Sequence, residues 1–327
     1  MSLLPCPVPL LRARISALMQ RFSAIVLRPA SADNLFRRAF RAGLLSLLLA
    51  AVANSVAAQE APYFVTYDHH MEEPGNLEIA TWTTLGVPRS GQKLFFAPFS
   101  EFEYGVTARW TTELYLESQA TSGDSAVFTG WRLENRFKPL KREHWINPIL
   151  YFEYEAINEA SKIHKEVVGN AGISDERNAE LAATNAHEIE AKLILSSNLH
   201  DWNLAGNFIV EKNLSQDEGF EFGYALGVAR PLAKLASGAE CRFCRENFTA
   251  GLELYGGLGS TNGFGFHETA HYLAPVISWQ LSDNSSLHFS PLVGLTNVSY
   301  PLLLRFGYAY EIRAFGRKVA QMFGGKP

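Results

Sequence analysis

The stretch LLLRFGYAYEIRAF, residues 302–315, alternates between two kinds of side chain. One face carries Leu304, Phe306, Tyr308, Tyr310 and Ile312. The other face carries Arg305, Gly307, Ala309, Glu311 and Arg313. A period of two residues predicts a β-strand, and an aromatic face opposite a charged face is typical of a membrane barrel, whose apolar side contacts lipid. An ordinary half-buried strand is the alternative.

Part of this stretch resembles a known signal. Arg305, Gly307, Tyr310 and Ile312 are similar to the polar-x-Gly-x-x-apolar-x-apolar pattern in the closing strand of bacterial outer-membrane β-barrels. The resemblance implies that barrel-assembly machinery is a partner during biogenesis. It also leaves residues 316–327 as a C-terminal tail, because the chain continues beyond the closing strand.

The N-terminal region has the organisation of a targeting segment. An apolar run at residues 42–53 follows three arginines and precedes the small residues Val56, Ala57 and Ala58. Because this run is too short to span a bilayer, residues 1–58 predict a cleaved secretory signal peptide, with a buried Ala/Leu helix as the alternative. About 40 residues precede the run, so we expect an over-extended start, with Met19 as a candidate true start.

Removal of residues 1–58 changes the formal charge from −4 to −10. An acidic chain argues against nucleic acid as a partner and against electrostatic binding to anionic membrane surfaces. No later stretch reaches the roughly 18 apolar residues that a spanning helix requires. The remaining classes are a periplasmic protein, a secreted protein or a barrel, and the expected location is the cell outer membrane.

From residue 76 onward, segments rich in β-branched and aromatic residues recur between turn-forming clusters, and their length suits tilted membrane strands. We interpret them as twelve strands, with ten to fourteen possible: 76–86, 92–104, 109–119, 126–137, 149–157, 187–197, 202–212, 219–229, 247–257, 271–281, 286–295 and 302–315. The predicted fold is all-β, a transmembrane antiparallel up-and-down β-barrel over residues 76–315. Pro98, Pro275 and Pro291 conflict with it, because a closed barrel has no edge for a missing N–H donor.

The connections follow the same prediction. Short connections follow even strands and the longest, residues 158–186, follows an odd strand, as expected if both ends of the barrel chain are periplasmic. The connections 138–148 and 230–246 are longer than this rule allows. In the longest connection, Ser174 predicts the start of a short helix that ends at Thr184.

Residues 59–75 are expected to form a periplasmic lead-in. They contain the cluster Asp68, His69, His70, Glu72 and Glu73. Such side chains can bind a metal, but no helix or strand spacing aligns them, so a polar lead-in without metal is the preferred interpretation.

The alternation also assigns side chains to the two faces of the wall. Lumen-lining residues are expected to be Arg109, Glu113, Glu117, Arg132, Glu134, Arg136, Glu153, Glu155, Glu188, Glu190, Lys192, Glu221, Glu253, Arg305 and Glu311. Interleaved apolar residues, among them Trp110, Leu114, Trp131, Leu133 and Phe152, are expected to face lipid. The charged residues either form a salt-bridge lattice that fills the lumen or line a wet channel that favours cations. A soluble two-sheet sandwich is the alternative.

Two cysteines remain after signal removal, Cys241 and Cys244, and in an oxidising compartment they are candidates for a disulfide. The sequence HETAH, with His267, Glu268 and His271, matches the H-E-x-x-H zinc-protease pattern. That chemistry needs a helix, which the preceding glycines and the strand-like continuation do not support.

His288 and Ser290 have the H-x-S spacing of outer-membrane lipid hydrolases, which this resemblance keeps open as a minor alternative. Those enzymes continue the motif with Asn, whereas Pro291 follows here. No glycine-rich phosphate loop precedes a helix, so nucleotide binding has no support. Neither an enzyme activity nor a cofactor is expected.

Taken whole, the chain resembles transporter-like outer-membrane barrels, including a family labelled as components of a phenol-degradation meta-pathway. The resemblance is carried by LFFAPFSEFEYGVT (94–107), WTTELYLE (110–117) and the final strand. It implies a porin or transporter for small-molecule solutes in contact with outer-membrane lipid. A structural barrel with a plugged lumen is the alternative.

Overall fold

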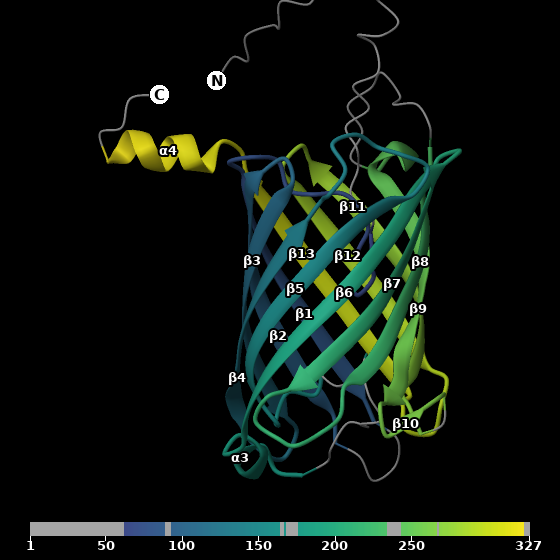
Figure 1. The fold of residues 1–327 in the computed structure, drawn as a ribbon. Coiled ribbons are helices and arrows are strands. Elements are labelled where there is room, and N and C mark those ends of the chain that lie inside the picture. Colours follow the sequence, from purple (N-terminus) through teal and green to yellow (C-terminus); the bar gives the residue numbers. More distant parts are fainter. Residues whose placement is uncertain are drawn as a thin grey trace, which may run out of the picture. The chain divides into compact units, whose positions relative to one another are not determined.

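The computed structural model describes residues 62–88, 93–163, 167, 176–233, 243–266 and 268–323. The predicted signal peptide, Cys241 and His267 lie outside these ranges. Within them, twelve long strands form one closed antiparallel barrel (Figure 1), which confirms the predicted all-β fold and the strand number. The strands are β1 Leu77–Val87, β2 Phe95–Thr107, β3 Trp110–Thr121, β4 Ala126–Phe137, β5 Asn147–Asn158, β6 Asn185–Leu199, β7 Trp202–Asn213, β8 Glu221–Pro231, β9 Phe248–Ser260, β11 His271–Ser282, β12 Ser285–Gly294 and β13 Leu302–Ile312.

Short elements complete the fold. Strand β10, Gly263–Phe264, pairs only with the end of β9. The helical elements of the described residues are α3 (Asn178–Leu181), η2 (Arg245–Asn247) and α4 (Phe315–Met322). Helix α3 is shorter than the predicted helix and has no side-chain cap; Ser174, the expected cap, lies outside the described residues. No helix in the described ranges is long and apolar enough to cross a membrane.

Strand β13 closes the barrel against β1, from the pair Leu77 and Ile312 to the pair Val87 and Leu302. The indole of Trp82 covers the backbone of Gly307, so closely that a Cβ atom on Gly307 would collide with the ring. This contact is a physical reason for glycine in the closing pattern, since an aromatic ring on a neighbouring strand compensates for its missing side chain. The strand ends at Ile312, three residues before the predicted end.

The two rims of the barrel differ in their connections. At the terminal rim, where β1 begins and β13 ends, two-residue turns follow β2, β6 and β11. The turn after β6 places His200 (φ 49°) and Asp201 (φ 69°) in the left-handed region, which matches the twist of the two strands. The connections 138–146 and 232–247 at this rim are longer, as the sequence had indicated. At the opposite rim, the loop rim, lies the longest connection, residues 159–184.

The three strand prolines lie where the ladders are interrupted. Between β11 and β12 the pairing stops after Leu273 with Val293 and resumes at Ile277 with Phe289, in unchanged register. Pro275 and Pro291 therefore face each other across one gap, and a single interruption accommodates both missing donors. Pro98 lies in a similar gap between β2 and β3 and still pairs with β1.

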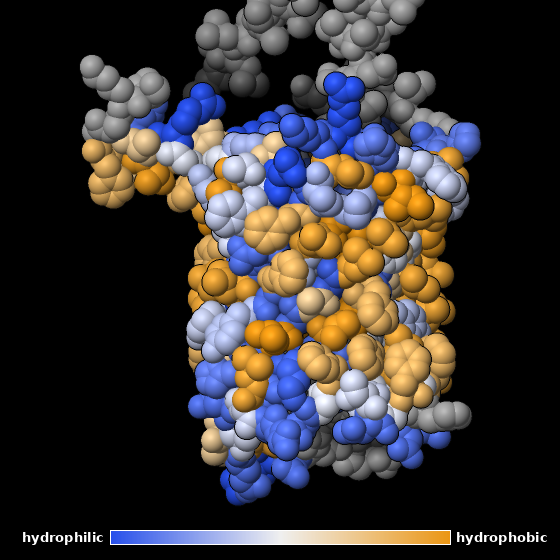
Figure 2. Space-filling view, in the orientation of Figure 1, coloured by the Kyte–Doolittle hydropathy of each residue, from blue (hydrophilic) through white to orange (hydrophobic). Residues whose placement is uncertain are grey.

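Outward side chains are apolar and inward side chains are polar. Trp110, Leu114, Trp131, Leu133 and Phe152 are all exposed on the outer surface, as predicted. Figure 2 shows that such residues form an apolar band around the middle of the visible wall, with hydrophilic residues at both rims. The single closed sheet rules out the sandwich alternative, and the band is what a bilayer requires of a barrel.

Candidate functional site in the barrel lumen

The lumen contains a segment of the chain itself. Residues 62–75, here called the lead-in, lie inside the barrel as far as Glu72 and reach the terminal rim at Glu73 and Pro74, which are exposed. This corrects the expectation that the whole segment lies in front of the barrel. Tyr63, Thr66, Asp68, His69 and Glu72 are buried. The reason is chemical: the lead-in has no regular secondary structure, and the inward side chains of the wall supply the partners that its backbone needs.

Glu253 on β9 makes the most concentrated contact with the lead-in. Its carboxylate accepts backbone N–H bonds from Phe64 (3.0 Å), Val65 (3.0 Å) and Thr66 (2.7 Å). The side chain is fully buried. Three donors on one carboxylate make a charge-assisted anchor, because hydrogen bonds to an ionised acceptor are stronger than those to a neutral one.

Two asparagines of β7 add contacts. Asn207 accepts a bond from the backbone N–H of Tyr67 (2.7 Å) and donates to its carbonyl oxygen (2.8 Å). Asn203 accepts from the hydroxyl of Tyr63 (3.1 Å) and donates to the carboxylate of Asp68 (2.9 Å). Because one side chain holds residues 63 and 68, the lead-in bends between them.

A histidine pair lies near the terminal rim. The rings of His69 and His70 stack at 4.6 Å, Asp68 contacts His70 Nδ1 at 2.7 Å, and His69 Nδ1 lies within hydrogen-bond distance of Ser196 Oγ. Burial, followed by the charge of His70, lowers the pKa of His69. Burial alone would raise the pKa of Asp68, but the hydrogen bond and charge of His70 outweigh it, so that this pKa is also lowered.

Buried ion pairs cover the wall from β2 to β5. Arg132 Nε lies 2.7 Å from Glu117, and its Nη1 lies 2.9 Å from Glu153. Arg136 Nη2 contacts Glu103 and Glu113. All these side chains lie on the inner face, and they form ion pairs of the kind expected for one of the two alternatives, the salt-bridge lattice.

The lattice also contacts the lead-in. Tyr67 donates its hydroxyl to Glu134 (2.8 Å), whose other oxygen lies 3.1 Å from Arg136 Nε. Lys192 pairs with Glu190 (2.8 Å) and lies 4.8 Å from the ring centre of Tyr67. The lead-in is therefore bound from both sides, by amides and a carboxylate on one wall and by ion pairs on the other.

The long loop reaches into the lumen from the loop rim. Ala160, Ser161 and Lys162 are buried, and the Lys162 N–H donates to Gln119 (2.9 Å). Ile163 of this loop packs against the same hydrophobic cluster as Val65 of the lead-in. Two segments, one from each rim, thus meet inside the barrel.

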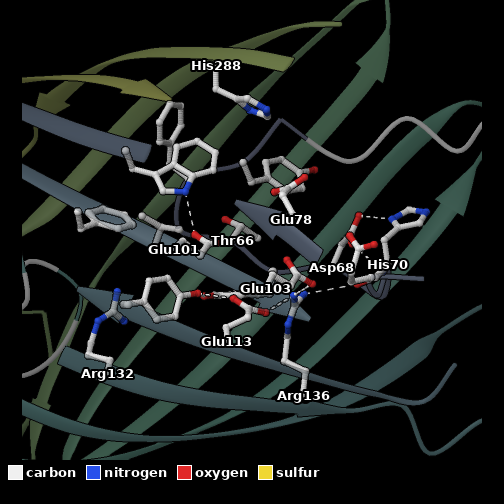
Figure 3. A pocket seen from close by; sticks show the side chains of 18 residues that line it. Thr66, Asp68, His70, Glu78, Glu101, Glu103, Glu113, Arg132, Arg136 and His288 are labelled. Atoms are coloured by element: carbon white, nitrogen blue, oxygen red, sulfur yellow. Dashed lines mark hydrogen bonds and ion pairs between the residues drawn. The ribbon is translucent and has the colours of Figure 1, made fainter. Parts of the chain in front are cut away.

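At least two cavities lie beside the lead-in. The larger, of about 160 Å³, lies against β1 to β4, and Figure 3 shows Glu101, Glu103, Glu113 and Arg136 around it with Thr66 of the lead-in. The smaller, of about 110 Å³, is lined by residues of the lead-in and the long loop and by wall residues such as Arg305. Both cavities have acidic and aromatic walls.

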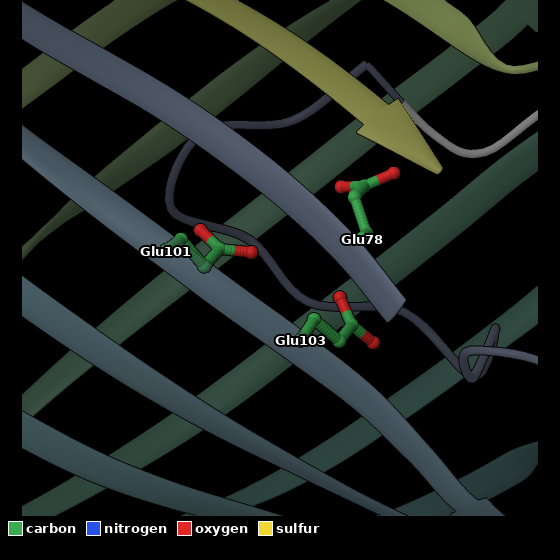
Figure 4. A group of neighbouring side chains, drawn as sticks. All are labelled: Glu78, Glu101 and Glu103. Carbon is green, nitrogen blue, oxygen red and sulfur yellow. The ribbon is translucent and has the colours of Figure 1, made fainter. Parts of the chain in front are cut away.

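Two groups of carboxylates could offer oxygen ligands to a cation. Glu78 of β1 and Glu101 and Glu103 of β2 converge on one space (Figure 4), with ligand atoms within 4.8 Å of one another. The second group is Glu153, Glu155 and Glu190. Basic groups already neutralise both in part, because Arg136 pairs with the first group, and Arg132 and Lys192 pair with the second.

The residues predicted to line the lumen fall into three sets. Most lie on the inner face and are buried or nearly so: Glu113, Glu117, Arg132, Glu134, Arg136, Glu153, Glu155, Glu188, Glu190, Lys192, Glu253 and Arg305. Glu221 and Glu311 are half-buried near the strand ends.

Arg109 differs from the prediction. It is exposed in the turn between β2 and β3, and its guanidinium donates to the carbonyl oxygens of Lys138 and Pro139, each at 2.9 Å. The strand begins at Trp110, so the predicted alternation had been extended one residue into the turn.

Sequence reasoning missed several contact residues. Glu78, Glu101 and Glu103 follow the same alternation and could have been found from it. Asn203 and Asn207 carried no such signal, because a neutral inward amide predicts nothing about what it binds.

The enzyme-like motifs do not assemble a catalytic site among the described residues. His288 Nε2 lies 2.9 Å from Ser286 Oγ, while Ser290 pairs across the sheet with Arg305. In HETAH, Glu268 has φ 62° and His271 begins β11, so these two residues do not share a helix. Cys244 is disulfide-bonded; the predicted pairing with Cys241 stays a prediction.

A closed antiparallel barrel with an apolar outer band and a charged interior belongs to the class of outer-membrane β-barrels. No family model matches the sequence, and a search of characterised proteins finds no match. Similar solved structures include an outer membrane channel from Pseudomonas putida F1 (TM-score 0.49, 12% identity, 76% of this chain and 100% of that chain). Others are the KdgM porin in complex with disordered oligogalacturonate (0.42, 9%, 72% and 98%) and the Ralstonia pickettii toluene transporter TbuX (0.32, 9%, 74% and 90%). Because these TM-scores are below 0.5 and the identities are 12% or less, the function is argued from this chain's own residues.

Proposed function

We propose that this protein is an outer-membrane channel for small solutes, and that the lead-in and the long loop close its lumen from opposite rims. The observation that carries the proposal is the lead-in itself. A barrel filled by its own inward side chains has no room for an additional segment, whereas here a chain segment with its side chains occupies the interior. Without that segment, the bore would be wide enough for a small solute.

The contacts of the lead-in support a displaceable closure. They are made by a limited number of side chains, chiefly Glu253, Asn203, Asn207 and Glu134. Among the described residues the lead-in joins no ladder of the sheet, and its backbone bond to the wall runs from the Gly75 N–H to the Gly105 carbonyl oxygen (2.7 Å) at the terminal rim. Release would therefore leave the ladders of the barrel intact.

The charge of the wall suggests which solutes pass. Carboxylates outnumber basic groups on the inner face, even after the ion pairs of Arg132, Arg136 and Lys192 are counted. A ring of carboxylates lowers the energy of cations in a pore and raises that of anions. Small cationic or neutral solutes are the proposed cargo.

Biogenesis belongs to the same proposal. The terminal rim carries the two-residue turns that characterise the periplasmic side of such barrels. Export would use residues 1–58 as a signal peptide, and the closing pattern at Arg305, Gly307, Tyr310 and Ile312 would be read by the barrel-assembly machinery.

A structural barrel with a permanently plugged lumen is the second candidate. The observation that favours it is the largely buried ion-pair lattice between β2 and β5, which is expensive to rearrange once formed.

Planar-bilayer conductance separates the two candidates. We would compare the full mature chain with a deletion of residues 62–74, a truncation of residues 160–183, and both changes together. The double variant should show discrete, cation-selective open steps. A matched control deletes residues 315–323, which lie outside the lumen, and should conduct like the parent.

Folding is checked first by heat-modifiable gel mobility, so that an unfolded variant is not mistaken for a closed one. A folded double variant that stays closed would overturn the channel proposal and establish the plugged structural barrel. Open steps with anion selectivity would refute the proposed cargo and retain the channel.

A further inference from the structure

Helix α4 follows the closing strand and leaves the barrel wall. Figure 1 shows it at the terminal rim, directed away from the barrel and across the direction of the strands. None of its side chains is buried, and Met322 and Phe323 at its end are 81% and 85% exposed. The end of the helix thus presents apolar side chains that are largely exposed.

The helix is amphipathic. At 100° per residue, Phe315, Val319, Met322 and Phe323 fall on one face, at the spacing i, i+4, i+7 and i+8. Arg317, Lys318 and Gln321 fall on the other face, and the helix contains no acidic residue. This basic charge contrasts with the acidic balance of the barrel chain.

The start of the helix is fixed to the rim. Ala314 has φ 54°, which turns the chain sharply after β13, and its N–H donates to Asn76 Oδ1 (2.8 Å). The N–H of Gly316 donates to the carbonyl oxygen of Gly75 (3.0 Å). The direction in which α4 leaves the barrel is therefore built into the fold.

The first turn of α4 also touches the outer surface of the barrel. Phe315 packs edge-on against Tyr104, with ring centres 6.4 Å apart. Tyr104 alternates with the inward Glu103 on β2 and so faces outward, near the end of the strand. In Figure 2 the apolar residues of α4 lie on its lower side, the side nearer to the height of the barrel's apolar band. Its hydrophilic residues lie on the upper side.

An isolated helix of eight residues is not stable in water, because nucleation costs more than so few hydrogen bonds return. A surface that buries the apolar face of α4 would stabilise the helix. The position at the edge of the lipid-facing band identifies that surface as the membrane interface, where short helices with a basic polar face lie in the plane of the bilayer.

We propose that α4 is an interfacial anchor, whose apolar face inserts among the phospholipid acyl chains beside the barrel and whose basic face contacts anionic headgroups. The anchor fixes the terminal rim at the bilayer surface. It is independent of the channel activity.

The test uses the mature chain in vesicles of phosphatidylethanolamine and phosphatidylglycerol, with Cys241 and Cys244 changed to Ser. Nitroxide labels are placed at Met322→Cys on the apolar face and, in a separate sample, at Gln321→Cys on the polar face. Collision with oxygen, which concentrates in lipid, and with a water-soluble nickel chelate is measured at each site. The ratio of oxygen to nickel collision should be severalfold higher at position 322.

Two results would overturn the anchor. Equal ratios at both sites would place α4 in water, and shielding of both labels from both reagents would show that a protein surface, such as a second copy, covers it.

Proteolysis gives an independent readout. Trypsin cleaves after Arg317 and Lys318 only when the helix detaches, so the cleavage rate follows the detached population. Replacing Val319 and Met322 together by Asp should accelerate cleavage at least about tenfold, while Gln321→Asp on the polar face should leave it nearly unchanged. Equal rates in both variants would contradict insertion.

Discussion

The lead-in and α4 meet at the terminal rim and then take opposite directions. The N–H of Gly316 bonds to the carbonyl oxygen of Gly75, although the two residues are far apart in sequence. The lead-in enters the lumen, where Glu253 and Asn207 bind its backbone, whereas α4 points away from the barrel (Figure 1).

The difference follows from backbone hydrogen bonding. A helix pairs its interior N–H and C=O groups within itself and can lie at the membrane interface, where water reaches its ends. An irregular segment cannot lie against lipid, because nothing in a hydrocarbon layer replaces water as a partner. The lead-in is irregular and must find its partners on the polar side of the wall. At this rim, the state of the backbone decides which side of the barrel a segment occupies.

The largest expected effect comes from removing the Glu253 carboxylate. Glu253→Ala leaves one buried and two partly buried N–H groups without their acceptor, at about 1–3 kcal/mol each, so release of the lead-in should become at least roughly 100-fold more populated. Open probability is measured in the background truncated at residues 160–183, where only the lead-in limits the current.

The matched variant is Glu253→Gln, which keeps the shape and one acceptor oxygen and should have a clearly smaller effect. Unchanged open probability in folded Glu253→Ala would mean that this carboxylate does not hold the lead-in.

A smaller effect is expected at Asn207. Asn207→Ala removes two hydrogen bonds to the backbone of Tyr67, worth about 1–3 kcal/mol together. Open probability should rise about 5- to 150-fold in the same background. Asn213→Ala is the control on the same strand, because Asn213 contacts Glu188 and the following turn. An equal response of both variants would point to general loosening of β7.

Acidification should loosen the lead-in. When the lead-in is released from the lumen, His69 is expected to titrate near pH 6.5. Inside the lumen its pKa is lower. Below about pH 6.5 the released state therefore takes up a proton first and becomes more favourable. The lead-in therefore binds most tightly in the lumen above that pH. Below it, the binding free energy falls by up to about 1.4 kcal/mol per pH unit. Asp68 acts in the same direction below about pH 4, since its seated pKa is also lowered.

The groups that face His69 are His70, Asp68, Glu143 and Lys138, and their charges are included in this expectation. Open probability between pH 7.5 and 5 is the readout. His69→Asn retains a hydrogen-bonding side chain without titrating, and it should flatten the profile over this range; an unchanged profile would assign the pH response to another group.

The smallest effect is expected at the turn into α4. Ala314 pays about 1–2 kcal/mol for its left-handed conformation, and glycine avoids most of that cost but loses more backbone entropy on folding. Ala314→Gly should therefore stabilise the protein by at most about 1 kcal/mol, and Ala314→Val should destabilise it. Urea unfolding midpoints measure both, and conductance should change in neither. A change in conductance would show that the two sides of the rim are coupled.

The sequence predicted which side chains of the barrel wall face inward and which face outward, because the alternation along a strand depends only on neighbouring residues. Arg132, Glu153 and Glu253 were assigned to the inner face from their neighbours alone, and their burial agrees with that assignment. Local rules failed at boundaries, where Arg109 belongs to a turn and β13 ends at Ile312 because Ala314 turns left-handed.

By itself, the sequence determined that this chain forms a closed barrel with an apolar outside and a charged inside, since a period of two residues, repeated over twelve segments, needs no knowledge of distant partners. Only the tertiary structure decided where residues 62–75 lie. Their polar composition suits water as well as a lumen, and the choice depends on Glu253, Asn203 and Asn207. Those residues are more than a hundred positions away, and only barrel closure brings them to the lead-in.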